Sequence, residues 1–213
     1  MTDDHLFVEL IRRRLSVERF DPSHRLDEAT VRALVADAAE APSSFNIQHW
    51  RFIAVRREAD KARLMEAAYG QRQVADAAVT FIVLGDAAGV ERLPEVLERA
   101  VAEGALAAER ADAWLEMAQE LYADPALARD EAIRSACLAS MVLMLAAEAR
   151  GLASGALIGF DPEKVRREFA VPAGCVPVML LAVGRALEMD GARKPRLEVD
   201  SILSFDDGRG LER

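Results

Sequence analysis

The sequence contains only two cysteines among 213 residues, Cys137 and Cys175. They lie far apart, and neither has a second cysteine or a histidine at metal-ligand spacing. This pattern argues against a disulfide framework and predicts no metal site. Cys137 lies in an apolar helical run and Cys175 directly precedes a predicted strand, so we expect both thiols to be buried and reduced.

Cations are also in deficit. The chain carries 27 Lys and Arg against 36 Asp and Glu, which gives a net charge of −9. Because binding to phosphate-rich surfaces needs a surplus of cations, neither a nucleic-acid nor a membrane partner is expected. The longest apolar run, residues 136–149, is shorter than the ~20 residues that span a bilayer. The first residues are acidic and lack the long apolar region of a signal peptide, so we expect a cytoplasmic protein.

Hydrophobic residues make up 52% of the chain and charged residues 30%. This composition supports a core with a soluble surface, and the length fits a single domain spanning residues 1–213. The periodicity of apolar residues predicts helices before Pro22, after Asp27 and over residues 61–69 and 130–150, and strands over residues 50–55, 79–84 and 176–183. Because helices outnumber short and separated strands, the fold class is α+β or α/β.

Two segments differ from the predicted core. Residues 91–122 have helical periodicity but many charges, which predicts an exposed helical excursion over about 88–128, with Trp114 packing inward. The tail from about residue 188 to 213 is polar and contains Pro195. We therefore expect a C-terminal extension that leaves the core and packs on something else.

The segment from Ala41 to Trp50 contains the densest group of neutral polar side chains. Ser43, Ser44, Asn46 and Gln48 place two hydroxyls and two amides within six residues, between a predicted helix and a predicted strand. Such a loop can hydrogen-bond a flat ligand with polar edges. The alternative is a loop whose side chains only satisfy their own backbone.

Cations cluster at two places. Arg12, Arg13 and Arg14 are followed by Leu15 and Ser16 at the end of the first predicted helix, and Lys194-Pro195-Arg196 lies in the C-terminal extension. Arginine forks suit phosphate well. The alternatives are a solvated helix end favoured by the helix dipole and a charged linker.

Taken in order, these segments resemble the nitroreductase family of flavoproteins from about Ile11 to Arg196. The most specific signal is the family segment Ala-Pro-Ser-x-x-Asn-x-Gln-Pro-Trp, in which His49 replaces the second proline and the matching residues are Ala41, Pro42, Ser43, Asn46, Gln48 and Trp50. The family's opening helix ends in an Arg-Arg-Ser-x-Arg-like motif, in which Glu18 occupies the last place here. Residues 71–77, 146–152, 158–161 and 194–197 resemble four further family segments in the same order.

The resemblance implies an α+β, nitroreductase-like fold with a central mixed β-sheet surrounded by helices. It also implies an intertwined homodimer that builds two FMN sites from both subunits, with the 188–213 extension packing on the partner subunit. By position, the FMN phosphate would be held by Arg14, Lys194 and Arg196, with Arg13 as a helper, and Ser16 would contact the ribityl chain.

The flavin ring would be contacted by other segments. The resemblance places Gln73 at the polar edge of the ring, with Gln71 as the alternative if the register differs, and the backbone amide of Gly159, beside Ile158, near flavin N5. The residues that would line the flavin from the other subunit are Pro42, Ser43, Ser44 and Asn46.

The implied activity is that of an NAD(P)H-dependent flavin oxidoreductase, which reduces nitroaromatics, quinones or similar small electron acceptors by a ping-pong mechanism. We find no self-contained acid–base pair, which suits flavin chemistry because there the protein supplies positioning and electrostatics. Two alternatives remain. One is a specialised flavoenzyme of the family acting on an enone, an aldehyde or a halogenated substrate. The other is a flavin-deficient dimeric binding or regulatory module, suggested by Leu15 and by Glu18, whose carboxylate would repel an anionic reduced flavin.

Overall fold

The computed structural model describes residues 3–187 and 193–211. Its helices of seven or more residues are α1 (Asp3–Arg13), α2 (Glu28–Ala38), α3 (Glu58–Ala67), α5 (Leu93–Ala102), α6 (Ala108–Leu121), α7 (Pro125–Ala149) and α8 (Pro162–Glu168). Shorter helical segments are η1 (Ser44–Asn46), α4 (Gln73–Asp76), η2 (Gly89–Arg92), η3 (Val199–Ser201) and η4 (Arg209–Leu211). The strands are β1 (Trp50–Val55), β2 (Val79–Asp86), β3 (Ala153–Leu157) and β4 (Cys175–Gly184).

The four strands form one sheet in the order β1-β2-β4-β3, and each neighbouring pair is antiparallel. The register pairs Trp50 of β1 with Gly85 of β2, and Val79 of β2 with Val183 of β4. The sequence predicts a mixed sheet. Within the four-stranded ladder this is wrong, and the parallel pairing among the described residues is the isolated bridge between Ser16 and Ser154, beside β3.

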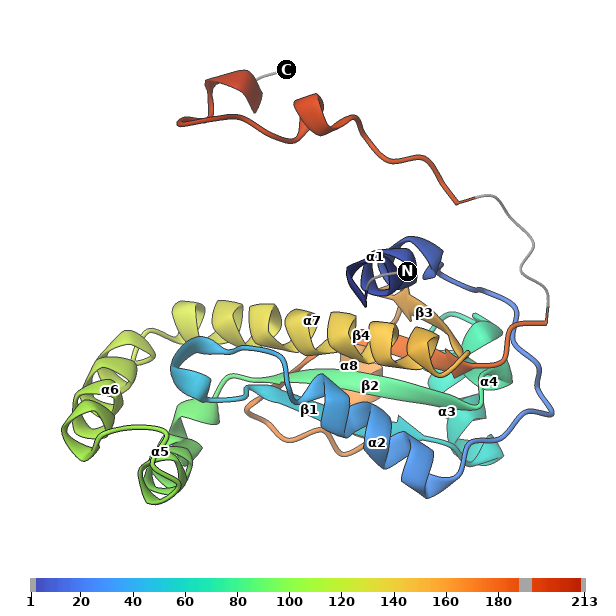
Figure 1. The fold of residues 1–213 in the computed structure, drawn as a ribbon. Coiled ribbons are helices and arrows are strands. Elements are labelled where there is room, and N and C mark those ends of the chain that lie inside the picture. The colour runs from blue at the N-terminus through green and yellow to red at the C-terminus, as the bar shows by residue number, and fades with distance from the viewer. Residues whose placement is uncertain (1–2, 188–192, 212–213) are drawn as a thin grey trace.

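The sheet lies between two groups of helices because its central strand is apolar on both faces (Figure 1). Side chains alternate across a strand, so Phe81 and Val83 of β2 face the cluster that includes α2 and α7. Ile82 and Leu84 face the opposite cluster, which includes residues of α3 and α8. This alternation explains why residues 79–84 form an unbroken apolar run.

Helix α7 crosses one face of the sheet and is longer than the sequence pattern predicts, because Asp124 accepts a hydrogen bond from the Ala126 amide and Pro125 opens the first turn. Alanines on its buried side allow close approach: a Cβ on Gly85 would lie 2.7 Å from the Ala132 carbonyl oxygen. In the described part of the chain, α7 is the one helix long and apolar enough to cross a membrane. It packs against α2 and against β1 to β4, as the core helix of a globular domain does.

Two details differ from the sequence predictions. Strand β3 was not expected, because its sequence Ala-Ser-Gly-Ala-Leu lacks β-branched residues, yet it pairs with the edge of β4. Cys175 is buried as expected, but Cys137 is exposed because it is not on the buried side of α7, which includes Ala136 and Ala139. Loss of hydration by the surrounding protein raises the pKa of both thiols, so neither is activated as a thiolate.

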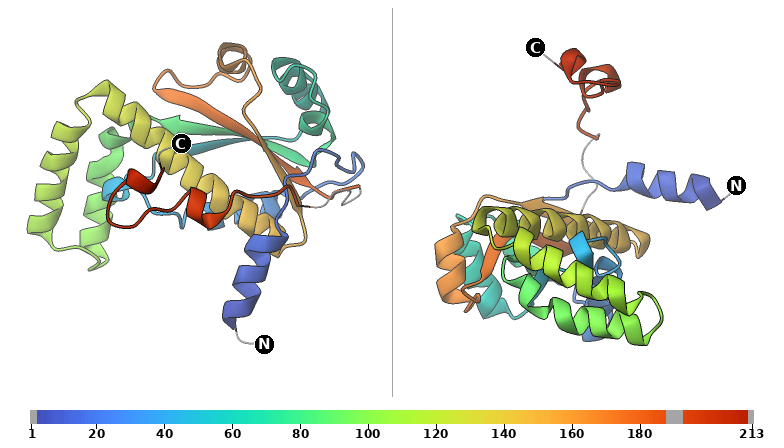
Figure 2. Two further views of the ribbon diagram at one scale, coloured as in Figure 1. Left: turned by 90° about the horizontal axis from the view of Figure 1, so that it is seen from above. Right: turned by 90° about the vertical axis from the view of Figure 1, so that its left-hand side faces the viewer.

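The segment predicted as a helical excursion contains η2, α5 and α6, which lie beside the main body and share a small core with Phe45, Ile47 and Ala128 (Figures 1 and 2). The segments that follow α1 and β4 meet at the opposite side. The Asp21 amide donates to the Arg185 carbonyl oxygen over 2.9 Å, and the Leu187 amide donates to the Arg19 carbonyl oxygen over 3.1 Å. From there the residues 193–211, called the arm below, project away from the body (Figure 2).

Candidate functional site

Two of the cations predicted to bind phosphate, Arg14 and Arg196, lie near each other where α1 ends. Burial, followed by the charges of Arg193 and Arg196, lowers the pKa of Arg14, so both of these guanidinium groups lie within electrostatic reach of Arg14. Arg193 donates hydrogen bonds to the carbonyl oxygens of Arg12 and Arg14, which ties the start of the arm to the end of α1. Like charges repel, so such a cluster is a natural place for a phosphate dianion.

Two of the predicted phosphate residues are placed differently from Arg14. The Arg13 Nε donates to Glu148 Oε1 over 2.6 Å, so Arg13 is already paired with a carboxylate of α7. Lys194 is exposed on the arm, and the side chain of Arg196 folds back to donate to the Lys194 carbonyl oxygen over 2.9 Å. Arg193, which the sequence analysis did not select, contacts the helix end directly.

Ser16 lies at a close junction between the N-terminal segment and β3. It bridges to Ser154 in parallel, and the amide of the next residue, Val17, donates to the Ser154 carbonyl oxygen over 3.0 Å. A Cβ on Gly155 would lie 2.3 Å from the Val17 carbonyl oxygen, so this contact requires glycine. The same Cβ position is 3.5 Å from Gln73 Oε1, which places the predicted ribityl contact and the predicted ring contact side by side.

The two glutamines and Gly159 form a second group beside this junction. Gln71 Nε2 donates to the Gly159 carbonyl oxygen over 2.6 Å, and Gln73 Nε2 lies 3.4 Å from Gln71 Oε1. Ile158, just before Gly159, is 81% exposed, and Gly159 is exposed as well. Gln71 is therefore committed to the Gly159 turn, which leaves Gln73 as the freer amide and favours it for the ring edge.

The polar loop over residues 43–48, called the 43–48 loop below, has a strained backbone. Phe45, Asn46 and Gln48 all have positive φ angles of 50° to 57°, although none is glycine. Ser43 stabilises the loop, since its Oγ accepts a hydrogen bond from the Gln48 amide over 2.9 Å. Non-glycine residues in this region are uncommon and concentrate at functional sites. Of the predicted contacts, Pro42 and Asn46 are exposed, and Ser43 and Ser44 are half-buried.

One chain does not bring this loop to the other predicted residues. The loop leads into Trp50, which pairs with Gly85 near the end of β2, whereas Gln71 and Gln73 precede Val79 at its beginning. A strand rises about 3.3 Å per residue, so the two groups are separated by roughly 20 Å along β2. In Figure 1 the 43–48 loop lies near α6, and α4 and β3 lie at the far end of the sheet.

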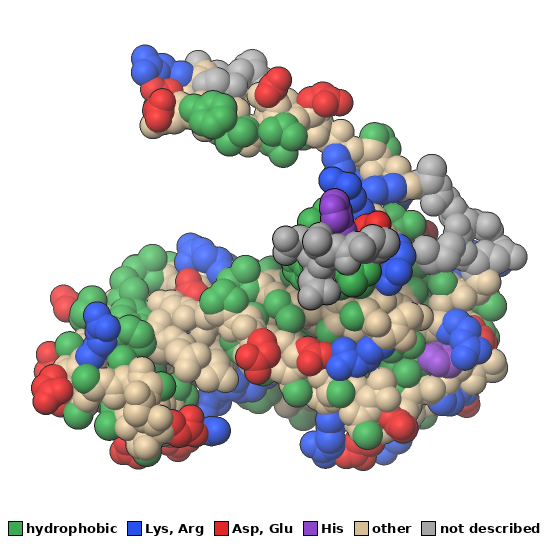
Figure 3. All heavy atoms as spheres, in the orientation of Figure 1, with side chains coloured by type: hydrophobic (Ala, Val, Ile, Leu, Met, Phe, Trp, Pro, Cys, Tyr) green, Lys and Arg blue, Asp and Glu red, His purple; other side chains and the backbone are tan. Residues whose placement is uncertain are grey.

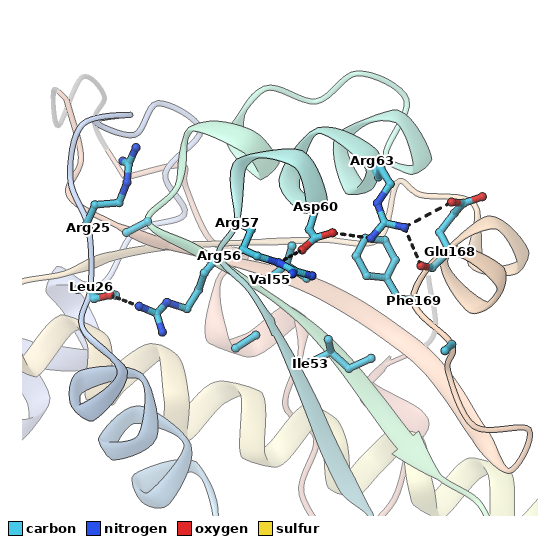
Figure 4. Close-up of a pocket in the computed structure, with 13 residues that line it drawn as sticks. Arg25, Leu26, Ile53, Val55, Arg56, Arg57, Asp60, Arg63, Glu168 and Phe169 are labelled. Carbon is cyan, nitrogen blue, oxygen red and sulfur yellow. Dashed lines mark hydrogen bonds and ion pairs between the residues drawn. The ribbon is translucent and has the colours of Figure 1, made fainter.

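A surface hollow of about 850 Å³ lies away from both groups, at the edge of β1. Figure 4 shows that Arg56, Arg57 and Arg63 are engaged by other groups of the chain. Asp60 accepts hydrogen bonds from Arg57 and Arg63, both at 2.5 Å, and Arg56 donates to the Leu26 carbonyl oxygen over 3.0 Å. Because these cations are already paired, the hollow is a structural ion-pair network rather than a candidate for the active site.

Comparison with known proteins identifies the family. A family model described as the nitroreductase family matches residues 11–185. YodC of Bacillus subtilis, assigned as an NAD(P)H nitroreductase, is 32% identical over 181 residues, which cover 85% of this chain and 90% of that protein. The CLA biosynthesis enone reductase of Lactiplantibacillus plantarum is 31% identical over 180 residues, covering 82% and 83% of the two chains.

Solved structures resemble the fold as a whole. A protein of Exiguobacterium sibiricum, assigned as a nitroreductase and solved in complex with FMN, is 29% identical with a TM-score of 0.87. The match covers 96% of this chain and 98% of that one. The chain therefore belongs to the nitroreductase family, whose members are FMN-dependent NAD(P)H oxidoreductases.

Proposed function

We propose that two copies of this chain form a homodimer with two FMN sites, each shared between the subunits. The observation that carries the proposal is the separation of the 43–48 loop from Gln73 and Ser16 by the length of β2. Each chain thus carries one half of a site at either end of its sheet. A two-fold axis would join the halves twice, because every contact in such an interface occurs in two copies.

Exposed apolar side chains support the same arrangement. Phe7 on α1 is 56% exposed, Leu138 on α7 is 47% exposed and Phe205 on the arm is 80% exposed. Figure 3 shows hydrophobic side chains on the side of the arm that faces α7, and on α7 itself. Monomers rarely leave contiguous apolar surface of this kind uncovered. A second copy of the chain is the partner that would cover it.

The residues at the two ends fit the chemistry of FMN. Arg14, Arg193 and Arg196 offer guanidinium groups to the phosphate, and Arg14 is partly buried, which strengthens its interaction with an anion. The absence of a side chain at the exposed Gly159 allows a planar ring to approach the backbone. When bound, FMN supplies the hydride acceptor and donor, taking two electrons from NAD(P)H and passing them to an acceptor that binds next.

The reaction we propose is the reduction of nitroaromatics, quinones or similar electron-poor molecules. Reduction of an enone is the second candidate, because a relative with 31% identity is named an enone reductase. In both cases the dimer orients the flat reactants between the 43–48 loop of one subunit and the Gly159 turn of the other.

Absorbance spectroscopy of the purified protein tests this proposal. Flavin bands should be present after incubation with FMN and desalting, and should bleach on anaerobic addition of NADH or NADPH. Adding a nitroaromatic, a quinone or an α,β-unsaturated ketone should then restore the bands, and the fastest acceptor identifies the substrate class. Sedimentation should give twice the mass of one chain. A monomer that retains FMN would contradict the shared site, and a protein without flavin bands would contradict the redox function.

A further inference from the structure

Two separate parts of the 88–128 excursion contact the same buried side chain, His49. His49 is fully buried just before β1, and its Nδ1 lies 2.9 Å from the Asp86 carbonyl oxygen. Because a carbonyl oxygen can only accept, Nδ1 must carry the hydrogen and donate it. This bond fixes the orientation of the ring. His49 occupies the place of the second proline in the family segment, so this chain has an imidazole where that segment has a proline ring.

Both ends of the excursion pack on the His49 ring. At its beginning, a Cβ on Gly89 would lie 2.7 Å from His49 Nδ1, so only glycine lets η2 approach so closely. At its end, Tyr122 follows the last residue of α6, and its ring meets the His49 ring edge to face with centroids 5.6 Å apart. The excursion therefore leaves and rejoins the body at the same imidazole.

The excursion also holds the 43–48 loop. The Phe45 ring packs edge to face on Trp114 of α6 with centroids 5.9 Å apart, and on Tyr122 at 6.4 Å. The Ser44 side chain also interacts with the Tyr122 hydroxyl: burial raises the pKa of Tyr122, and Ser44 acts in the opposite direction. Phe45 has a φ of 50°, a conformation that persists in a non-glycine residue only where the surroundings impose it. Trp114 and Tyr122 are the surroundings that do so.

We propose that the excursion is a support for the cofactor loop, with His49, Trp114 and Tyr122 as positioning residues. They hold Phe45 and its neighbours in the left-handed conformation and thereby present Ser43, Ser44 and Asn46 to the flavin. The role at the flavin rests on the proposed function, whereas the role in holding the loop does not. A lid would instead leave the loop unchanged and act on access of the acceptor.

Hydrogen exchange in the protein without FMN tests the support directly. The amides of Asn46, Ile47 and Gln48 donate within the loop to the Ser43 carbonyl, the Ser44 carbonyl and the Ser43 hydroxyl. Trp114→Ala should raise their exchange rates about tenfold, whereas Trp114→Phe, which keeps an aromatic ring, should restore them to near the wild-type rates. Glu116→Ala, at an exposed position on the same helix, is the control and should change nothing.

The same variants are then titrated with FMN. Trp114→Ala should raise the dissociation constant of FMN about tenfold, and the acceptor KM should change less than FMN affinity. Tyr122→Phe keeps the ring contacts but loses the hydroxyl, so it should raise exchange and FMN dissociation by a smaller factor, about threefold. This milder variant decides the matter if Trp114→Ala does not fold.

The outcomes separate the two proposals. Unchanged exchange rates of the loop amides in Trp114→Ala and Tyr122→Phe would overturn the proposal that the excursion supports the loop, even if FMN binds to the wild type. A shift in acceptor KM alone would identify the excursion as a lid and also overturn it. If the wild type fails to bind FMN, the proposed function is lost, and faster loop exchange in the variants would still establish the support.

Discussion

The cation cluster at the end of α1 and the 43–48 loop are both proposed to contact FMN, but different forces hold them in place. The loop is embedded in a packed cluster of aromatic and aliphatic side chains. The cation cluster is joined to the body mainly through backbone carbonyl oxygens that accept from Arg193, and it consists of groups that repel one another. Packing therefore forms the 43–48 loop before FMN binds. The cation cluster, in contrast, would be stabilised by the charge of the FMN phosphate.

Loss of a guanidinium group should therefore have the largest effect on binding. Arg196→Ala should weaken FMN binding by at least tenfold, because a charge-assisted hydrogen bond contributes about 1.5–3 kcal/mol. The protein without FMN should not be destabilised, since the substitution removes a like charge near Arg14. Titration with FMN and thermal unfolding measure the two effects. Arg32→Ala on α2 is the control, and equal affinity in both variants would remove Arg196 from the phosphate site.

A methyl group at Gly155 should disturb the junction between the N-terminal segment and β3. Gly155→Ala brings a Cβ against the Val17 carbonyl oxygen, and overpacking of this kind costs about 1–3 kcal/mol. We expect a lower midpoint of chemical unfolding and weaker FMN binding, because Ser16 moves with Val17. Ala156→Ser, at an exposed position on the same strand, is the control. Normal stability in Gly155→Ala would show that the Val17 backbone does not pack tightly against Gly155.

Truncation of an exposed aromatic ring on the arm should act on assembly. Phe205→Ala should raise the dissociation constant of the dimer about tenfold, since burying a large apolar side chain contributes about 1.5–3 kcal/mol. Sedimentation velocity over a concentration series measures this, with Glu198→Ala on the same arm as the control. A dimer unaffected by Phe205→Ala would place the interface elsewhere than on this part of the arm.

The smallest effect is expected at the hollow beside β1. Hydrogen bonds from Arg63 and then Arg57 lower the pKa of Asp60. A lowered folded-state pKa adds stability above the unfolded value of about 3.9, and this stability is lost as the pH falls through the folded value. Asp60→Asn should therefore lower the Tm slightly at neutral pH, with the difference vanishing in strong acid. A changed FMN affinity in this variant would contradict the purely structural role of the hollow.

The sequence predicted local features better than contacts between distant segments. The polar loop before β1 and the buried run of β2 were predictable because turn chemistry and apolar periodicity are local properties. Strand β3 was not, because only its pairing with β4 makes a strand of Ala153–Leu157. Arg193 was missed and Arg13 was assigned to phosphate because their partners, the end of α1 and Glu148, are far away in the sequence. The role of His49 likewise depends on Gly89 and Tyr122, which are brought to it only by folding.

The pairing of residues 19–21 with residues 185–187 constrains when the site can form during synthesis. The Arg19 carbonyl oxygen and the Asp21 amide find their partners only in Leu187 and Arg185, close to the end of the chain. Contacts over such a sequence separation form slowly, and on the ribosome they must wait until residues 185–187 have emerged. A nascent chain can thus pack α2, β1 and β2 early, whereas residues 19–21 can pair only after β4 has been made. Translation products that stop before Arg185 would lack this closure of the N-terminal segment.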